Sequence, residues 1–577
     1  MKLLGSNHSR TGITERKRNL DPLRSHPHSR PMICLLHGYG LTGSGSNLWT
    51  RAVARALCQN GHTIHVVCQE TDPAILDFVT AAYVYDADSQ PELLFERQVD
   101  YPGGCVLHRP TLDLLPVYVR PPKGDTYLRA IPDMDDESVE AYLHRNVQVL
   151  RHIVQTHGIS ALHANHVVLM SIVAQRVSQE LGVPYAIMPH GSAIEYVVRK
   201  DERMKALAAS ALSECQRIFV LSDEIRERLN EVFPALPDAE QRMRPLRVGV
   251  DTDQFKLVER PERPRAIGRL KSAVADEARG KSPALTRQLY DGLSDDMGKD
   301  DLLELIEATT DYTAKAPDTD LEDKLDAMDW VDGDIIGFVG KIIGFKGLQS
   351  VIAAFPAILE ERPHARLVVT GRGPLREAME ALVWALANGR RELARNIARW
   401  GGELEGEPSQ PFVAVHRFFE GLAGEGTLDA YFDAAQRNLT TGHVVFTGYL
   451  DHQALCHLYP CWDVAIFPSM VAEAGPMVLV EALASGSYPM GSNHSGIKYN
   501  LDIVADNLPD ADARPMRLGP EPASIVADII ANTPRALAIQ GKYRDELRQA
   551  AVQKYSWTRI AEDLARELQG MAGPGAG

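Results

Sequence analysis

From residue 32 onward, short apolar runs alternate with stretches of helical spacing. Each run has roughly four to eight residues, the length of a buried strand, and residues that favour turns bound it. This alternation is typical of βαβ units, in which helices connect parallel strands. The sequence therefore predicts an α/β protein built on parallel sheets.

The apolar runs form two series, and a chain of 577 residues is too long for one compact core. We therefore expect two Rossmann-like, doubly wound parallel-sheet domains that face each other across a cleft, with helical insertions. Helices are expected at 138–157 and 167–181. The expected strands are 32–37, 62–69, 161–165, 185–190, 217–222 and 246–250 in the first domain, and 334–340, 365–371, 443–449, 463–469 and 487–492 in the second.

Shifts in composition set the expected boundaries. The units are a disordered basic leader at 1–30, a first Rossmann-like domain at 31–255, an acidic helical insertion at 256–333, a second Rossmann-like domain at 334–550 with an insertion at 385–440, and a C-terminal helix and flexible tail at 551–577. The C-terminal helix is expected to pack back on the first domain. The insertions have two open roles, covering the cleft or forming a homo-oligomer.

Composition excludes several classes of protein. The formal net charge of −16 argues against a surface that binds nucleic acid, because phosphate contacts need clustered Lys and Arg. Seven cysteines without a CxxC pair favour reduced thiols and a cytoplasmic location. No apolar run reaches the roughly eighteen residues of a membrane span. Peripheral association with the inner face of a membrane is the alternative location.

The stretch "HGYGLTGSG" at 37–45 contains the spacing of a dinucleotide-binding fingerprint, from Gly38 to Gly43. The following helix is expected to begin at Leu48, which places Gly43 too early for that fingerprint. Glu70 nevertheless follows the next strand, where an acid that binds ribose would lie. On the residues alone, NAD, another phosphate or sugar ligand, and a plain turn all stay open.

The segment 463–486 carries the strongest signal for chemistry. A buried strand ends there in a loop with Glu473 and Gly475, and Pro476 is expected at the first position of a helix. The N-terminus of such a helix has unpaired N–H groups and a positive dipole end, which suit a diphosphate. Glu481 lies roughly 7.5 Å further along the helix axis, within reach of a ribose.

Two lysines follow another strand of the second domain. Lys341 comes directly after that strand and Lys346 precedes the next helix, in "GKIIGFKG". Two cations at the mouth of a strand can neutralise the charge that develops on a departing diphosphate. A solvated loop is the simpler interpretation of the same residues, since lysine is usually exposed.

These motifs, with "VVTGRGPLRE", "VVFTGYLDHQAL", "MPHGSAIEYV" and "KYSWTRIAEDLA", resemble those of retaining nucleotide-sugar glycosyltransferases of the GT-B fold, family 4. The resemblance implies that Lys341 and Lys346 bind the diphosphate and that Glu481 binds the ribose. It implies a donor-sugar site at Glu473, Ala474, Gly475, Pro476, Met477 and Val478. It also implies that Gly448, Tyr449 and Leu450 border the base, above Gly371 and Gly373. The family commonly has arginine where this chain has Lys341.

The resemblance implies that the first domain binds the acceptor and that the second domain binds the nucleotide sugar. It also implies that His190 of the first domain contacts the donor sugar. It implies that Gly43 and Gly45 approach the donor phosphates and the acceptor. NAD is therefore not the ligand expected at this loop. No metal and no cofactor are expected, because the lysines replace the charge of a cation. His163 and His166 lack companions for a zinc site, and the Asp133–Asp135 and Asp251–Asp253 pairs do not follow buried strands.

The expected reaction moves a sugar from a nucleoside diphosphate to an acceptor hydroxyl with retention of configuration. The acceptor is a glycan, a lipid or a small molecule. Three rivals remain: an NAD-dependent oxidoreductase that uses Gly38 to Gly43, a non-catalytic GT-B protein that binds a sugar nucleotide, and a glycan phosphorylase. The sequence shows no pyridoxal-lysine motif for the last of these.

Overall fold

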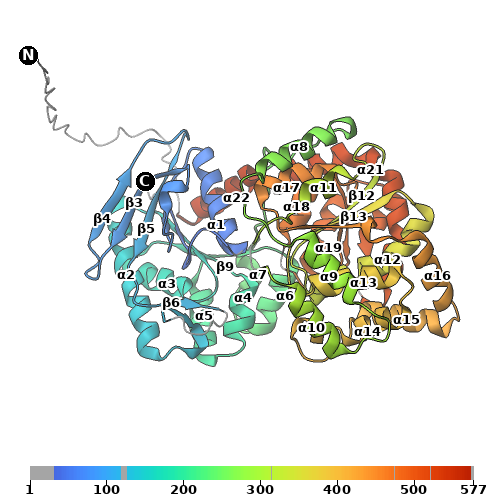
Figure 1. Cartoon of the computed structure of the whole chain (residues 1–577). Helices are drawn as coiled ribbons and strands as arrows, with labels where there is room; N and C mark the ends of the chain where they lie inside the picture. Colours follow the sequence, from blue (N-terminus) through green and yellow to red (C-terminus); the bar gives the residue numbers. More distant parts are fainter. Residues whose placement is uncertain are drawn as a thin grey trace, which may run out of the picture.

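The computed structural model describes residues 32–43, 45–118, 126–312, 315–473, 475–519 and 521–572. The expected leader and Ala474 lie outside these ranges. The described chain forms two lobes, each with helices packed around a sheet (Figure 1). The predicted fold class, α/β with two parallel sheets and helical insertions, is confirmed.

The first sheet has nine strands as far as the chain is described. Neighbouring strands are parallel except β3 and β4, which run antiparallel at one edge. Their order is β11 (Met243–Pro245), β10 (Arg217–Val220), β9 (Tyr185–Met188), β8 (Ala161–Asn165), β1 (Ile33–Leu36), β2 (Thr63–Val67), β5 (Gly104–Pro110), β3 (Val79–Tyr85) and β4 (Pro91–Glu96). A separate short pair joins β6 (Leu115–Val117) to β7 (Leu128–Ala130).

Helices with one apolar stripe cover this sheet. In α1 (Gly45–Gln59), Trp49, Val53 and Leu57 recur every four residues and are buried. Helix α22 (Trp557–Ala572) packs against α1, and the Asn60 side-chain amide donates to the Thr558 carbonyl at 3.0 Å (Figure 1). Helices α2 (Asp136–His157), α3 (Met170–Leu181) and α5 (Glu202–Glu214) pack in series as a second layer.

The second sheet has six parallel strands in the described chain. Their order is β14 (Val444–Gly448), β13 (Ala365–Thr370), β12 (Asp334–Val339), β15 (Val464–Phe467), β16 (Tyr488–Ser492) and β17 (Arg517–Leu518). Its helices include α12 (Leu348–Glu361), α13 (Arg376–Ala387), α18 (Met477–Ala484), α19 (Ser495–Ala505) and the long α21 (Ile525–Tyr555).

Both expected insertions are helical. The first contains α8 (Arg263–Ala273), α9 (Pro283–Gly292), α10 (Lys299–Thr309) and α11 (Leu321–Asp326), and the second contains α14 (Arg391–Trp400), α15 (Val413–Gly424) and α16 (Leu428–Asn438). Helices α9 and α10 of the first insertion pack against α13. The first insertion is therefore part of the second lobe's core rather than a detached linker.

Several local predictions are wrong. The expected strand at 246–250 is irregular, and β11 lies just before it. Helix α1 begins at Gly45 rather than Leu48, because Asn47 bonds the His37 ring instead of capping the helix. Strands β3, β4, β5 and β17 are not among the expected ones. No helix in the described ranges has the length and apolar content to span a bilayer.

Candidate active site

The C-terminal edge of the second sheet gathers the loops that carry most predicted donor-binding residues. The chain runs outward from β12 to β13 and β14 on one side, and through β15 to β17 on the other. The loops that follow β12 and β15 therefore diverge at this edge. In open α/β sheets, such a switch point is where ligands bind. Lys341 and Lys346 follow β12, and Glu473 follows β15.

An ion pair joins these two loops. Lys346 Nζ lies 2.7 Å from Glu473 Oε2, and the two side chains are 31% and 18% exposed. Helix α19 fixes the backbone of Glu473, whose N–H donates to Ser495 Oγ at 3.0 Å and whose carbonyl accepts from the Gly496 N–H at 2.7 Å. The structure thus holds a cation and a carboxylate together at the mouth of the sheet. Lys341, which precedes Lys346 in the same loop, is exposed.

Glycines let the loops approach backbone to backbone. Gly347 has φ +78°, and a Cβ there would lie 2.0 Å from the Pro468 carbonyl oxygen. A Cβ on Gly371 would lie 1.8 Å from the Gly340 oxygen, and one on Gly373 would lie 2.2 Å from the Ile342 oxygen. Close packing of the β12 and β13 loops therefore accounts for the two predicted glycines. Their contact with a ligand stays a prediction.

Helix α18 presents its N-terminus at the same edge. It begins at Met477, and Pro476 precedes it in an extended conformation as the N-cap residue, which corrects the expected first helical position. Within the described chain, no side chain caps this helix. Met477 and Val478 are half-buried, so the first turn is not fully covered by protein. Its free N–H groups suit an anion.

Glu481 is a buried carboxylate with two fixed partners. Glu481 is 4% exposed. The Tyr459 hydroxyl donates to Glu481 Oε2 at 3.0 Å, and His452 Nδ1 lies 3.1 Å from Oε1. The negative charge of Glu481 raises the pKa of His452, although burial opposes it. Neither partner was predicted, because only the three-dimensional fold brings them to α18. The carboxylate is held in one orientation before any ligand binds.

The first insertion completes the loop expected to border the base. Gly448 has φ +79°, and a Cβ there would lie 2.7 Å from the Asp318 amide nitrogen. That amide donates to the Thr447 carbonyl at 2.9 Å, and the Tyr449 N–H donates to the Ala316 carbonyl at 3.0 Å. Leu450 is buried beside them. No sequence pattern predicted that residues of the insertion would pair with this loop.

The first sheet has its own switch point between β1 and β8. His190 follows β9, the strand next to β8. Its Nε2 lies 3.1 Å from Asn165 Oδ1, and its ring centroid lies 4.6 Å from that of His166. Burial lowers the pKa of His190 to about 3, so the ring is neutral at pH 7. Gly43 and Gly45 are exposed, and a Cβ on either would meet no atom within 4 Å. Both glycines therefore leave the backbone open to a ligand.

The other acidic and histidine motifs have structural explanations. Asp135 caps α2 by accepting from the Ser138 N–H at 2.8 Å, and Asp251 accepts from the Asp253 N–H at 3.0 Å. The ring of His163 stacks on Trp49 with centroids 5.7 Å apart, whereas His166 packs on Tyr118 at 4.6 Å. The two histidines of "HANH" thus have different surroundings.

The loops predicted to bind the donor lie where the two lobes are in contact. A Cβ on Gly475 would be 3.0 Å from Val248 Cγ1 of the first lobe. Helix α19 packs against α6 (Asp223–Val232), and the Val250 N–H donates to the Tyr555 carbonyl at 2.7 Å. The loop after β15 is therefore close to the first lobe. His190, which follows β9, belongs to that lobe.

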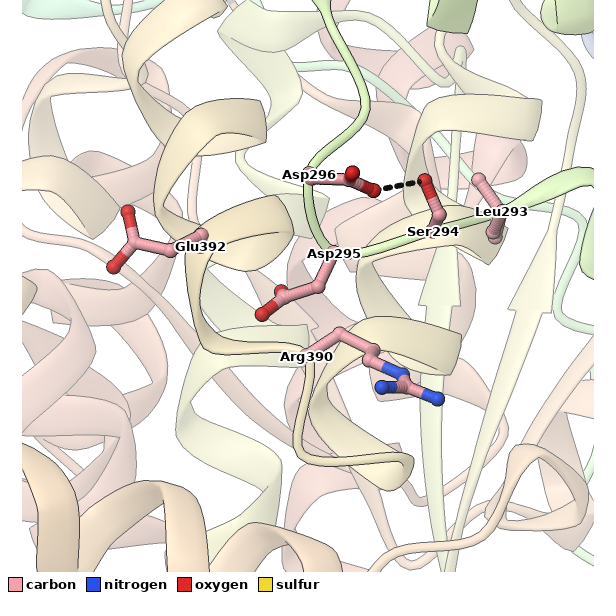
Figure 2. A pocket seen from close by; sticks show the side chains of 6 residues that line it. All are labelled: Leu293, Ser294, Asp295, Asp296, Arg390 and Glu392. Carbon is pink, nitrogen blue, oxygen red and sulfur yellow. Dashed lines mark hydrogen bonds between the residues drawn. The ribbon is translucent and has the colours of Figure 1, made fainter.

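A separate hollow of about 350 Å³ lies between the two insertions (Figure 2). Its lining residues are Leu293, Ser294, Asp295, Asp296, Arg390 and Glu392. Asp295 accepts from the Leu393 N–H at 3.0 Å at the start of α14, and Ser294 Oγ donates to Asp296 Oδ1 at 2.8 Å. Three carboxylates against one arginine disfavour a diphosphate, and no predicted site residue lines this hollow.

Two family models match separate parts of the chain. The model described as Glycosyltransferase Family 4 matches residues 43–254, and that described as Glycosyl transferases group 1 matches residues 421–507. A curated relative from Methanocaldococcus jannaschii, described as an uncharacterized glycosyltransferase, is 24% identical over 249 residues. That match covers 41% of this chain and 47% of the relative, so the chain spans about half the relative's length. These matches confirm the predicted resemblance to glycosyltransferase sequences.

Solved structures share the fold at low sequence identity. The catalytic domain of starch synthase IV from Arabidopsis thaliana, bound to ADP and acarbose, has a TM-score of 0.51 and 12% identity. The similarity covers 94% of this chain and 100% of that one. HepE from Anabaena in complex with UDP-glucose has a TM-score of 0.47 and 11% identity, over 93% and 99% of the two chains. The expected GT-B architecture is confirmed.

Proposed function

We propose that this protein is a retaining, metal-independent glycosyltransferase. Its GT-B fold and the matches of glycosyltransferase models in both lobes support this proposal. It transfers a sugar from a nucleoside diphosphate to an acceptor hydroxyl. The observation that carries this proposal is the Lys346–Glu473 ion pair at the switch point of the second sheet, beside the uncapped N-terminus of α18. A diphosphate there meets an ammonium group and backbone N–H groups together.

The same contacts suggest how the donor is oriented. Glu481 is fixed by Tyr459 and His452 at one end of the diphosphate site, where it accepts hydrogen bonds from the ribose. Glu473 releases Lys346 to the diphosphate and turns to the donor sugar. His190 approaches the sugar from the first lobe as a neutral ring.

Retention of configuration is the outcome that the family resemblance implies, and it is part of this proposal. In the unliganded site the Glu473 carboxylate is paired with Lys346, and the proposal assigns it contact with the donor sugar and not a covalent bond to it. The acceptor hydroxyl instead attacks from the face that the diphosphate leaves, and the departing oxygen takes its proton. Lys346 and the helix N-terminus stabilise the negative charge on that oxygen, so the reaction needs no metal ion. Closure of the lobes excludes water.

Thermal denaturation with UDP-, GDP- and ADP-sugars tests the proposal. At a hundredfold excess over Kd, the correct donor adds about 2.7 kcal/mol of stability and raises Tm, because it binds only the folded chain. Release of the nucleoside diphosphate on addition of acceptor sugars then distinguishes an enzyme from a binding protein. Stabilisation by NADH, with none by any sugar nucleotide, would support the oxidoreductase instead.

Glu481→Gln should weaken nucleotide binding about 10- to 100-fold. The neutral amide keeps an acceptor for Tyr459 but loses the charged hydrogen bond to the ribose, a contact worth about 1.5–3 kcal/mol. Isothermal calorimetry with the nucleotide selected by the screen measures this loss. A 2′,3′-dideoxy nucleotide is the matched control, and it should bind both proteins equally. An equal loss for both nucleotides would place Glu481 elsewhere.

A further inference from the structure

Three histidines converge on one face of the first sheet, outside the candidate active site. His65 lies on β2, His108 on the neighbouring β5, and His157 is the last residue of α2. One ring nitrogen from each lies within 4.8 Å of the other two. His108 is paired with Val67, two residues beyond His65, so both side chains project from the same face. They meet the end of α2 there.

The three rings have unequal partners. His65 Nδ1 lies 2.9 Å from His108 Nε2, and the Tyr85 hydroxyl lies 2.9 Å from His108 Nδ1. A hydrogen-bonded chain from Tyr85 through His108 to His65 satisfies these contacts without any ion. His157 stands outside that chain, since no hydrogen bond to its ring occurs within the described residues. Its ring nevertheless packs with its centroid 4.4 Å from that of His65.

We propose that His65, His108 and His157 bind one divalent transition-metal ion, with zinc as the best match. Neutral imidazole nitrogens suit zinc, copper and nickel, whereas magnesium and calcium require oxygen ligands. Zinc–nitrogen bonds of roughly 2.0–2.1 Å place neighbouring ligand atoms about 3.4 Å apart in a tetrahedral site. His65 and His108 therefore need to separate by only a few tenths of an ångström.

The surroundings fit this ligand set. A histidine that binds a metal usually donates its other N–H to an oxygen, and the Tyr85 hydroxyl lies where His108 Nδ1–H can donate to it. His65 and His108 are buried and His157 is half-buried, which leaves one side for entry.

Such an ion would act on stability rather than on transfer. It would join β2 and β5 to the end of α2, and these positions are not on the loops that carry the predicted donor site. The proposal is thus independent of the glycosyltransferase reaction, which still requires no metal.

Metal titration of the full chain after chelator treatment tests the site. We expect one Zn²⁺ per chain, a rise in Tm on adding Zn²⁺, and visible absorption from Co²⁺ in a low-coordinate site. His157→Ala should weaken Zn²⁺ binding at least about 100-fold, because loss of even a supporting group costs 10- to 100-fold. Circular dichroism checks that this half-exposed helix end stays folded.

His144→Ala is the matched control, since His144 is an exposed histidine on the same helix. It should bind Zn²⁺ as the unchanged protein does. Equal weakening by His144→Ala and His157→Ala, or no stoichiometric binding to the folded chain, would overturn the proposal. Chelator treatment should leave donor binding and transfer unchanged, and a loss of transfer would contradict the remote role assigned here.

Discussion

Replacing Lys346 with alanine is expected to lower the rate of sugar transfer by about 10²–10³-fold. Removal of one preorganised group that stabilises transition-state charge costs about 2.7–4 kcal/mol in comparable sites. The loss should fall mainly on kcat, because charge accumulates on the diphosphate only as the glycosidic bond breaks. Steady-state release of the nucleoside diphosphate, with the donor found by thermal screening, measures kcat and KM separately.

The Lys346–Glu473 ion pair allows a second test with a double variant. In the unliganded site, Lys346 already neutralises Glu473, so Lys346→Ala leaves a carboxylate alone beside the diphosphate. Lys346→Ala combined with Glu473→Gln should therefore bind the donor more tightly than Lys346→Ala alone, without recovering kcat. Lys542→Ala is a control, because Lys542 is 65% exposed and pairs with Asp512, outside the predicted site. Near-normal kcat in Lys346→Ala would show that the site is wrongly assigned.

The sequence was sufficient for the architecture because strand patterning is local. Apolar runs such as 334–340 and 365–371 became β12 and β13, since a strand buried on both faces shows as a continuous apolar run. The exposed edge strand β4 and the two-residue β17 lack such a run and were missed, and the largely buried strands β3 and β5 were missed as well. Signals spread over one strand and its loop are therefore recoverable from sequence.

Contacts between distant segments were not recoverable. The Lys346–Glu473 pair links residues 127 positions apart, although each residue was selected from its own loop. Tyr459, which helps to fix Glu481, lies in no motif, and His452 lies in "VVFTGYLDHQAL" but was not selected as a site residue. The three histidines of the proposed zinc site lie on β2, β5 and α2, and β5 was not an expected strand. Their convergence depends on strand order, which no local pattern specifies.

A buried ionic network binds the first insertion to the second lobe. Arg376 donates to both carboxylate oxygens of Asp318, at 2.7 and 2.6 Å, and contacts Glu380. Lys281 of the insertion lies 2.9 Å from Glu377 and 2.5 Å from Glu380. These five side chains are at most 2% exposed. Breaking a buried pair is costly because it leaves a charge without compensation.

Arg376→Met is expected to destabilise the second lobe by about 3–5 kcal/mol. For a lobe of this size, such a loss lowers Tm by roughly 10 °C, which scanning calorimetry detects. The matched control is Arg391→Met, because Arg391 also pairs with two carboxylates, Asp429 and Asp433, but is 39% exposed. Its loss should cost less than about 1 kcal/mol. Equal shifts in the two variants would contradict a special role for burial.

The effect of Arg376→Met should also depend on pH. Burial alone would raise the pKa of Asp318, but Arg376 and Lys324 outweigh it and hold that pKa below its usual value of about 3.9. A depressed carboxyl pKa stabilises the fold above the unfolded-state value, and this contribution disappears as pH falls through the folded-state pKa. The difference in Tm between the unchanged protein and Arg376→Met should therefore be largest near neutral pH and should shrink below about pH 4.

The same substitution should reach the donor site through the backbone. Asp318 also donates its N–H to the carbonyl of Thr447, near the end of β14, and the next residues, Gly448 and Tyr449, are predicted to border the base. Loosening Asp318 should weaken nucleotide binding in Arg376→Met, while Arg391→Met binds normally. Calorimetric titration below the Tm of both variants measures this. Unchanged affinity in a destabilised Arg376→Met would separate the insertion's role in stability from any role in holding the donor.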